Sequence, residues 1–176
     1  MQDATGFERS ISGQYSANVG AWLVSSAWAH RWWASYLYQP SEVLFPGILA
    51  LALGCWGATF VQERDGVGLK RDEARFYIFL TLFTFWLTFG PKAGLYTALY
   101  YTVPVFSFLR APSRAGIVVT MCLVVLAAPA IVVMLRRQKA NIAFAIILVL
   151  AVADTYRAPL RMRQAPPLPA AYTSLA

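Results

Sequence analysis

A polar, aromatic and proline-containing insert lies between two uncharged apolar runs. The runs cover 76–89 and 115–135, and the insert, 90–114, reads GPKAGLYTALYYTVPVFSFLRAPSR. Because hydrocarbon cannot hydrogen-bond a polypeptide backbone, an insert with three prolines must lie at a membrane interface or be covered by protein. The insert ends in two arginines, Arg110 and Arg114, directly before the second run. This arrangement predicts two membrane helices separated by a structured interfacial segment.

The composition supports a membrane protein. Of 176 residues, 59% are hydrophobic and 13% are charged, whereas a soluble domain has about 25% charged residues. The apolar residues are clustered in blocks, which predicts an all-α integral membrane protein. The net charge of +7 is expected to sit in loops and flanks beside anionic lipid head groups. No basic soluble domain is visible, so a nucleic-acid partner is not expected.

Four segments are predicted to span the membrane as helices, near 43–62, 74–90, 115–135 and 140–156, within a transmembrane domain at 42–156. Twenty helical residues reach about 30 Å, the thickness of the hydrocarbon core. Pro46 is expected in the opening turn of the first helix, and Pro129 is expected to kink the third. The insert predicts an amphipathic helix lying in the interface between the second and third spans.

The flanking segments and loops predict the orientation. Residues 1–41 are rich in Trp and Tyr, which is typical of an interfacial segment, with a short surface helix over 19–29. Residues 157–176 are proline-rich and predict an extended extracytoplasmic tail. The loops 63–75 and 136–139 hold seven bases. The positive-inside rule therefore places both loops in the cytoplasm and both termini on the outer face.

Few residues suggest chemistry. Cys55 and Cys122 fall in apolar runs without a metal-ligand spacing, and no cofactor motif is present, so neither metal nor cofactor is expected. His30, the only histidine, has no neighbouring carboxylate in the sequence. Asp154 lies within one turn of Arg157, which favours a local ion pair over a catalytic role. No catalytic residue is predicted.

Three cations of the insert are candidates for contact with a lipid-linked phosphate: Arg110, Arg114 and Lys92. A planar guanidinium can bind phosphate through two parallel hydrogen bonds. The alternative is that the arginines anchor the start of the following helix among head groups or pair with an acid on a neighbouring loop.

Four aromatic residues of the insert are candidates for the wall of an acceptor groove: Tyr96, Tyr100, Phe106 and Phe108. The alternative is an aromatic belt at the membrane interface, which the composition favours.

Three strings are similar to segments of a family of bacterial polytopic membrane proteins. They are LFPG at 44–47, FGPKAGLYTALYYTVPVFSFLRAPSRAG at 89–116 and GFERSISGQYSA at 6–17; the closing PPLPAAYTSLA at 166–176 also looks like a family segment. The family resembles glycosyltransferases of the GT-C superfamily, which use polyprenyl-phosphate sugars. The resemblance implies a bacterial cytoplasmic membrane, lipids and a polyprenyl-phosphate-linked sugar as partners.

The resemblance covers an internal or C-terminal part of such a protein. Family enzymes carry a catalytic acid, usually aspartate, in the first outer loop after the first membrane helix, and no residue here matches that position. The resemblance therefore implies a non-catalytic membrane-embedded part of a glycosyltransferase, completed by upstream helices or a partner bundle. A transporter or permease subunit and a non-catalytic structural membrane protein are the alternative functions.

Overall fold

The computed structural model describes residues 9–30, 32, 42–62, 69–136 and 140–157, and confirms the predicted all-helical fold class. One pair of two-residue strands is also present, with β1 (Val61–Gln62) parallel to β2 (Leu69–Lys70) and Val61 opposite Leu69. The α-helices are α1 (Arg9–Gln14), α2 (Val19–Leu23), α4 (Ile48–Gly57), α5 (Arg71–Thr88), α6 (Leu95–Thr102), α7 (Gly116–Leu135) and α8 (Ala140–Thr155). The 3₁₀ helices are η1 (Trp28–His30), η2 (Gly90–Ala93), η3 (Pro104–Phe108) and η4 (Pro112–Ala115).

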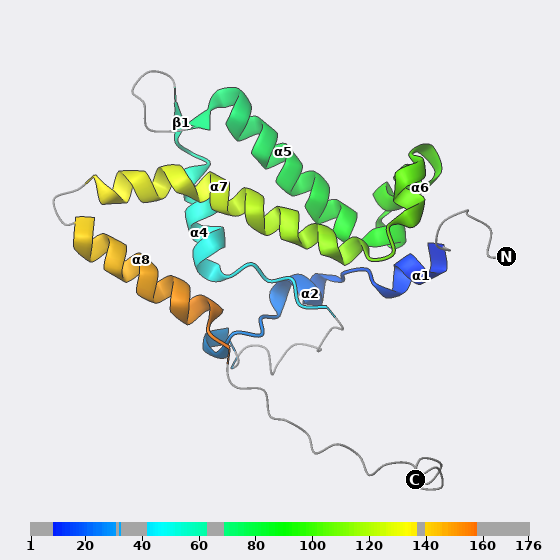
Figure 1. Ribbon diagram of the computed structural model, residues 1–176, viewed down its shortest axis with the longest axis horizontal. Coiled ribbons are helices and arrows are strands. Elements are labelled where there is room, and N and C mark those ends of the chain that lie inside the picture. Colours follow the sequence, from blue (N-terminus) through cyan, green and yellow to red (C-terminus); the bar gives the residue numbers. More distant parts are fainter. Residues whose placement is uncertain (1–8, 31, 33–41, 63–68, 137–139, 158–176) are drawn as a thin grey trace, which may run out of the picture.

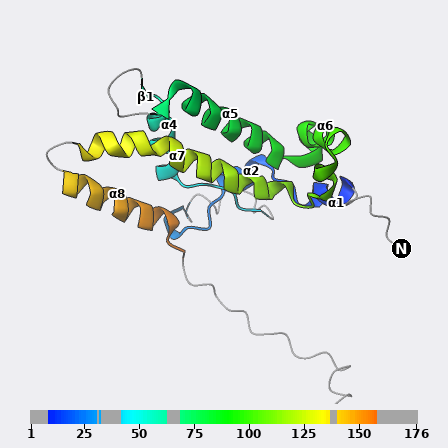
Figure 2. The ribbon, with the colours of Figure 1, turned by 45° about the horizontal axis from the view of Figure 1, so that its top comes forward.

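Helix α7 is the centre of the architecture. Helix α5 runs antiparallel to it, α4 crosses it on another side, and α8 returns alongside it (Figures 1 and 2). Helix α6 and the 3₁₀ turns of the insert close the end where α5 finishes and α7 begins (Figure 1). The bundle is therefore elongated, with the insert at one end and the first turn of α5 at the other.

Two glycines let α4 approach the backbone of α7 closely. A Cβ on Gly57 would overlap the carbonyl oxygen of Leu126, and a Cβ on Gly54 would lie 3.0 Å from the carbonyl oxygen of Leu123. Small residues at a helix crossing allow this backbone contact, which is how helices commonly associate in membranes. On the α7 side the contact region includes Ala127 and Ala130, which are both buried.

The first predicted span is wrong in its length. Instead of 43–62, the helix covers only Ile48–Gly57, which reaches about 15 Å at the helical rise. Gly47 precedes it with a φ of 101°, a conformation that ends the helix on this side. Pro46 consequently lies before the helix and not in its first turn. Beyond Gly57 the chain makes a tight turn, in which the Phe60 amide donates to the Gly57 carbonyl, and continues into β1.

The other three predicted helices are confirmed as helices near their expected bounds. Helix α5 begins three residues earlier than expected, where the Glu73 side chain accepts the amide hydrogen of Lys70. Helix α7 continues through Pro129 and, with η4 in front of it, forms one 24-residue helical stretch, Pro112–Leu135. Among the described residues, this is the one helix long and apolar enough by itself to cross a membrane.

The N-terminal segment contributes to the core, which the sequence did not predict. Ala21 and Trp22 are buried against Val119 and Leu123 of α7. The indole Nε1 of Trp22 donates to the hydroxyl of Thr88, 3.1 Å away. The predicted single helix over 19–29 is instead divided into α2 and η1, because the chain is extended at Val24. The predicted tail lies almost wholly outside the described residues, which end at 157.

Candidate functional site

The insert folds as a short α-helix with 3₁₀ turns before and after it. Helix α6 ends at Thr102, and Val103 is extended because the following Pro104 disfavours a helical conformation in the residue before it. Phe106 and Phe108 therefore lie on η3 and are not on the same helix as Tyr96 and Tyr100, contrary to the sequence prediction.

Tyr96 lies inside the insert and not on an open wall. Its side chain is fully buried, and its hydroxyl donates to the Leu109 carbonyl at 2.7 Å or to the Phe106 carbonyl at 3.2 Å. The hydroxyl of Ser12 lies 2.9 Å from the Tyr96 hydroxyl and 3.2 Å from the Leu109 carbonyl oxygen. The buried tyrosine thereby joins α6, the end of η3 and α1. Tyr100 is partly exposed beside it, and Phe108 is exposed.

The N-terminal segment covers the insert. The carbonyl of Tyr15 accepts the amide hydrogen of Ser113, and the Ala17 amide donates to the Thr88 carbonyl at 2.8 Å. Gly90, with a φ of 62°, has no room for a side chain, because a Cβ would overlap the hydroxyl of Ser16. Residues 12–17 therefore cover part of the insert, which is one of the two alternatives expected from the sequence.

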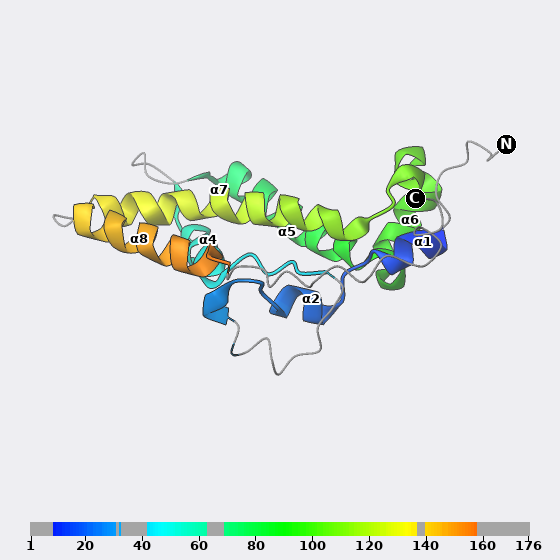
Figure 3. The same cartoon turned by 60° about the horizontal axis from the view of Figure 1, so that its bottom comes forward.

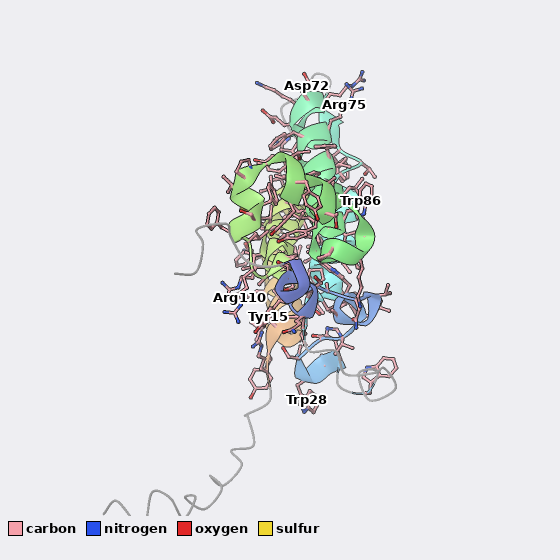
Figure 4. All side chains as sticks on the ribbon, turned by 90° about the vertical axis from the view of Figure 1, so that its right-hand side faces the viewer. Tyr15, Trp28, Asp72, Arg75, Trp86 and Arg110 are labelled. Carbon is pink, nitrogen blue, oxygen red and sulfur yellow. The ribbon has the colours of Figure 1, made fainter. Side chains whose placement is uncertain are left out.

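The three candidate phosphate contacts lie on three parts of the insert, and all are exposed. Arg110 is packed over the Tyr15 ring, with its guanidinium carbon 5.0 Å from the ring centroid, and donates to the Tyr15 hydroxyl at 3.1 Å (Figure 4). Arg114 lies on η4 and Lys92 on η2. Pro112 begins η4 between the two arginines, so no continuous helix connects them.

Replacing Tyr96 with phenylalanine is expected to lower the free energy of unfolding by about 1 to 2 kcal/mol. The change removes a buried hydroxyl that joins three segments, and leaves the Ser12 hydroxyl without one partner. The measurement is thermal unfolding in detergent. Tyr101→Phe is the matched control on the same helix, because the Tyr101 side chain is 72% exposed. Equal melting temperatures of the two variants would contradict the proposed contribution of the buried hydroxyl.

A second cluster joins residues that are far apart in the sequence. The His30 Nε2 atom lies 2.5 Å from Oδ1 of Asp154, and both side chains are nearly buried. The same carboxylate accepts the amide hydrogens of Ile48 at 3.3 Å and Leu49 at 3.0 Å. Asp154, at the end of α8, thus caps the start of α4 and binds η1 at the same time. A carboxylate is favourable at this position, because the first amides of a helix have no intrahelical acceptor.

The segment LFPG (44–47) packs directly against this carboxylate and its His30 partner. The amide of Leu44 donates to the Ala21 carbonyl at 2.8 Å, and the ring of Phe45 packs edge-on to the His30 ring, 5.4 Å between centroids. A Cβ on Gly47 would overlap Oδ2 of Asp154. Only glycine therefore combines the positive φ at this position with space for the carboxylate.

The cluster corrects two sequence predictions. Asp154 pairs with His30 and two backbone amides, and within the described part of the chain Arg157 makes no ion pair with it. His30 has a carboxylate neighbour that lies 124 positions away in the chain. The residue types alone gave a weak signal, because a buried acid in an apolar segment requires a partner, and the sequence could not say which residue supplies it.

The chemistry available at these clusters is binding and positioning. The Asp154 carboxylate is already bound by His30 and two backbone amides. Asp72 and Glu73 belong to the first turn of α5, and this turn lies at the opposite end of the bundle from the insert (Figure 1). Among the described residues, no group of three His, Cys, Asp or Glu side chains is arranged to hold a metal ion. Comparison with known proteins finds no matching family model, no matching curated protein and no matching solved structure.

Proposed function

We propose that the chain is a membrane-embedded, non-catalytic part of a glycosyltransferase of the GT-C type that uses lipid-linked sugars. In this role α5, α7 and α8 face lipid, and the insert with its N-terminal cover forms a cap on the outer face. The observation that carries the membrane assignment is the apolar surface of these three helices.

Helix α8 carries the clearest part of this apolar surface. It buries no residue, although its only polar side chains are Asn141, Asp154 and Thr155. Its exposed large apolar side chains cover most of the helix circumference; they are Ile142, Phe144, Ile146, Leu148, Val149, Leu150 and Val152. The remaining side is also apolar at Ala143, Ile147 and Ala151 and is partly buried. A helix that is apolar on every side is stable when hydrocarbon or a protein core surrounds it. No such core covers α8 within the described part of the chain, which supports a lipid environment.

Helices α5 and α7 extend the apolar surface. The exposed residues of α7 form a stripe at helical spacing, namely Ile117, Met121, Val124 and Val132. Those of α5 include Phe76, Phe79, Leu82 and Trp86. An exposed apolar area over three helices exceeds what a soluble monomer carries.

Charge at the two ends supports the predicted orientation. Lys70, Arg71 and Arg75 lie at the start of α5, and Arg136 follows α7 at the same end (Figure 1). The insert closes the opposite end and carries three bases, fewer than the seven in the sequence of the loops 63–75 and 136–139. The basic end accordingly belongs in the cytoplasm and the insert on the outer face of a bacterial cytoplasmic membrane.

The glycosyltransferase assignment is supported by the resemblance and by where its strings lie. In the string GFERSISGQYSA (6–17), Ser12 contacts Tyr96 of the insert and Ser16 lies against Gly90. Leu44 of LFPG packs against Gly116. Segments separated in the sequence therefore assemble into one outer-face unit. Such a unit fits a cap beside a lipid-linked substrate whose chemistry is performed by other helices.

Membrane integration is tested by extracting membranes with alkaline carbonate and then with detergent. We expect the chain to stay in the membrane pellet in carbonate and to dissolve in detergent. Release by carbonate would overturn the membrane assignment.

The role in sugar transfer is tested by following label from polyprenyl-phosphate-[¹⁴C]mannose and polyprenyl-phosphate-[¹⁴C]glucose into membrane acceptors. Membranes of a deletion strain carrying Arg114→Ala are expected to lose more label incorporation than those carrying Arg114→Lys, because Arg114 is exposed on the cap and lysine keeps its charge. Arg136→Ala, at the cytoplasmic end, is the charge-matched control. If label incorporation were the same with and without the chain while the chain stayed in the membrane pellet, the role in sugar transfer would be excluded. The alternative function, a structural membrane protein, would then be supported.

A further inference from the structure

A shallow apolar groove lies where η1 meets the end of α8. Its volume is about 590 Å³, and it is lined by Trp28, Ala29, Leu148, Val149, Val152, Ala153 and Tyr156. Helix α8 lies next to η1 at this end in the view of Figure 3. The lining is almost wholly apolar, so a ligand that fills it must be apolar as well.

Polar contacts fix the two sides of this groove relative to each other. The Trp28 amide donates to the Tyr156 carbonyl at 2.8 Å, and the nearly buried His30 is bound to Asp154, two residues before Tyr156. Both contacts join η1 to the end of α8. The groove is therefore preorganised by the fold, unlike the surface of an isolated apolar helix.

The groove changes in polarity along its length. Leu148 and Val149 lie toward the middle of α8, whereas Trp28 and Tyr156 are exposed large aromatic side chains at its end; Figure 4 shows Trp28 at the lower edge of the molecule. Tryptophan and tyrosine favour the level of lipid head groups. Arg157 follows Tyr156 directly and is exposed, while the neighbouring Asp154 is already bound by His30 and two amides. The groove thus has an apolar interior and an aromatic rim, and the exposed Arg157 follows the rim residue Tyr156 in the chain.

We propose that this groove binds an acyl chain of an anionic phospholipid, with Arg157 at the phosphate. The change from an apolar interior to an aromatic rim matches the polarity of such a lipid. The charge of the exposed Arg157, next to Tyr156 in the chain, favours an anionic head group over a zwitterionic one. A second groove on α8 is lined by Asn141, Ile142, Ala145, Ile146, Val149 and Leu150. Its lining has no aromatic residue, so it provides an internal comparison. The inference rests on the membrane location in the proposed function.

The test uses native mass spectrometry to measure the lipid that the purified protein retains in detergent. Phosphatidylglycerol and phosphatidylcholine with identical acyl chains are compared. The unmodified chain is expected to retain one phosphatidylglycerol in preference to phosphatidylcholine. Arg157→Gln is expected to lower this preference about fivefold, the effect of one cation near a lipid surface. Ala153→Trp fills the groove and is expected to abolish retention, whereas Ala145→Trp, the same change in the second groove, leaves it intact.

Each contrary result has a distinct meaning. Equal loss in the two tryptophan variants, or no difference between the two lipids, would overturn the site. An Arg136→Gln variant that loses as much preference as Arg157→Gln would overturn the role of Arg157, since Arg136 is exposed at the other end of α8. A dimer that is cross-linked through cysteine at position 152, which lines this groove and not the second one, and that excludes lipid would identify a second copy of the chain as the occupant and overturn the proposal. Carbonate extraction separates these outcomes from failure of the membrane assignment.

Discussion

Replacing Gly57 with leucine should cause the largest loss of stability in this protein. A side chain at this position has to enter the space held by the Leu126 carbonyl, which is backbone and cannot rotate away. Helices α4 and α7 would have to separate, and the cost is expected to be about 3 kcal/mol or more. The measurement is thermal unfolding in detergent, followed by the reaction of Cys122 with a fluorescent maleimide. Cys122 is buried, and a Cys55→Ser background leaves it as the only thiol of the chain.

An alanine series makes this prediction quantitative. Gly57→Ala should lower the melting temperature more than Gly54→Ala, because a Cβ at Gly54 still lies 3.0 Å from the nearest atom, the Leu123 carbonyl oxygen. Gly13→Ala is the control, since nothing lies within 4 Å of a Cβ there. If Gly57→Ala melted at the same temperature as Gly13→Ala, the close contact between α4 and α7 would be contradicted.

Replacing Asp154 with alanine should cost about 2 to 4 kcal/mol of unfolding free energy. The change removes the cap of α4 and leaves the buried His30 ring without its carboxylate partner. Asp154→Asn should recover only part of the loss, because the amide oxygen can serve some of the three donors while the amide nitrogen meets the others. The same maleimide assay measures both variants.

Two variants separate the capping role of Asp154 from its contact with η1. His30→Ala keeps both amide contacts to α4 and should lose less stability than Asp154→Ala. Asp72→Ala is the aspartate control, since Asp72 is almost fully exposed and lies 3.8 Å from Arg75. A melting temperature for Asp154→Ala that equals that of Asp72→Ala would refute the junction between α4, η1 and α8.

Helix positions were predictable where hydrophobicity alone determines them. The bounds of α7 and α8 followed from long apolar runs with charges at their ends, whereas the expected helix of the insert formed only in part, because Pro104 ends α6 before Phe106. The first span was predicted too long, because Gly47 and the turn after Gly57 act through backbone geometry that a hydropathy pattern does not contain. The candidate site was predictable only in part. The candidate cations Arg114 and Lys92 are exposed. Tyr96, in contrast, is buried by contacts with α1, in which Ser12 lies 84 positions earlier in the sequence.

The amino-acid sequence by itself determined the helical class, the apolar surfaces and the distribution of charge between the two ends, because these depend on residue type and on local periodicity. Only the tertiary structure decided that residues 9–22 cover the insert and enter the core, and that Asp154 pairs with His30. These pairings depend on which segments meet across α7. A polar group that is buried without a hydrogen-bond partner costs free energy, so a buried acid needs a donor. Any donor that the fold brings within reach can fill this role, and the sequence alone does not say which one does.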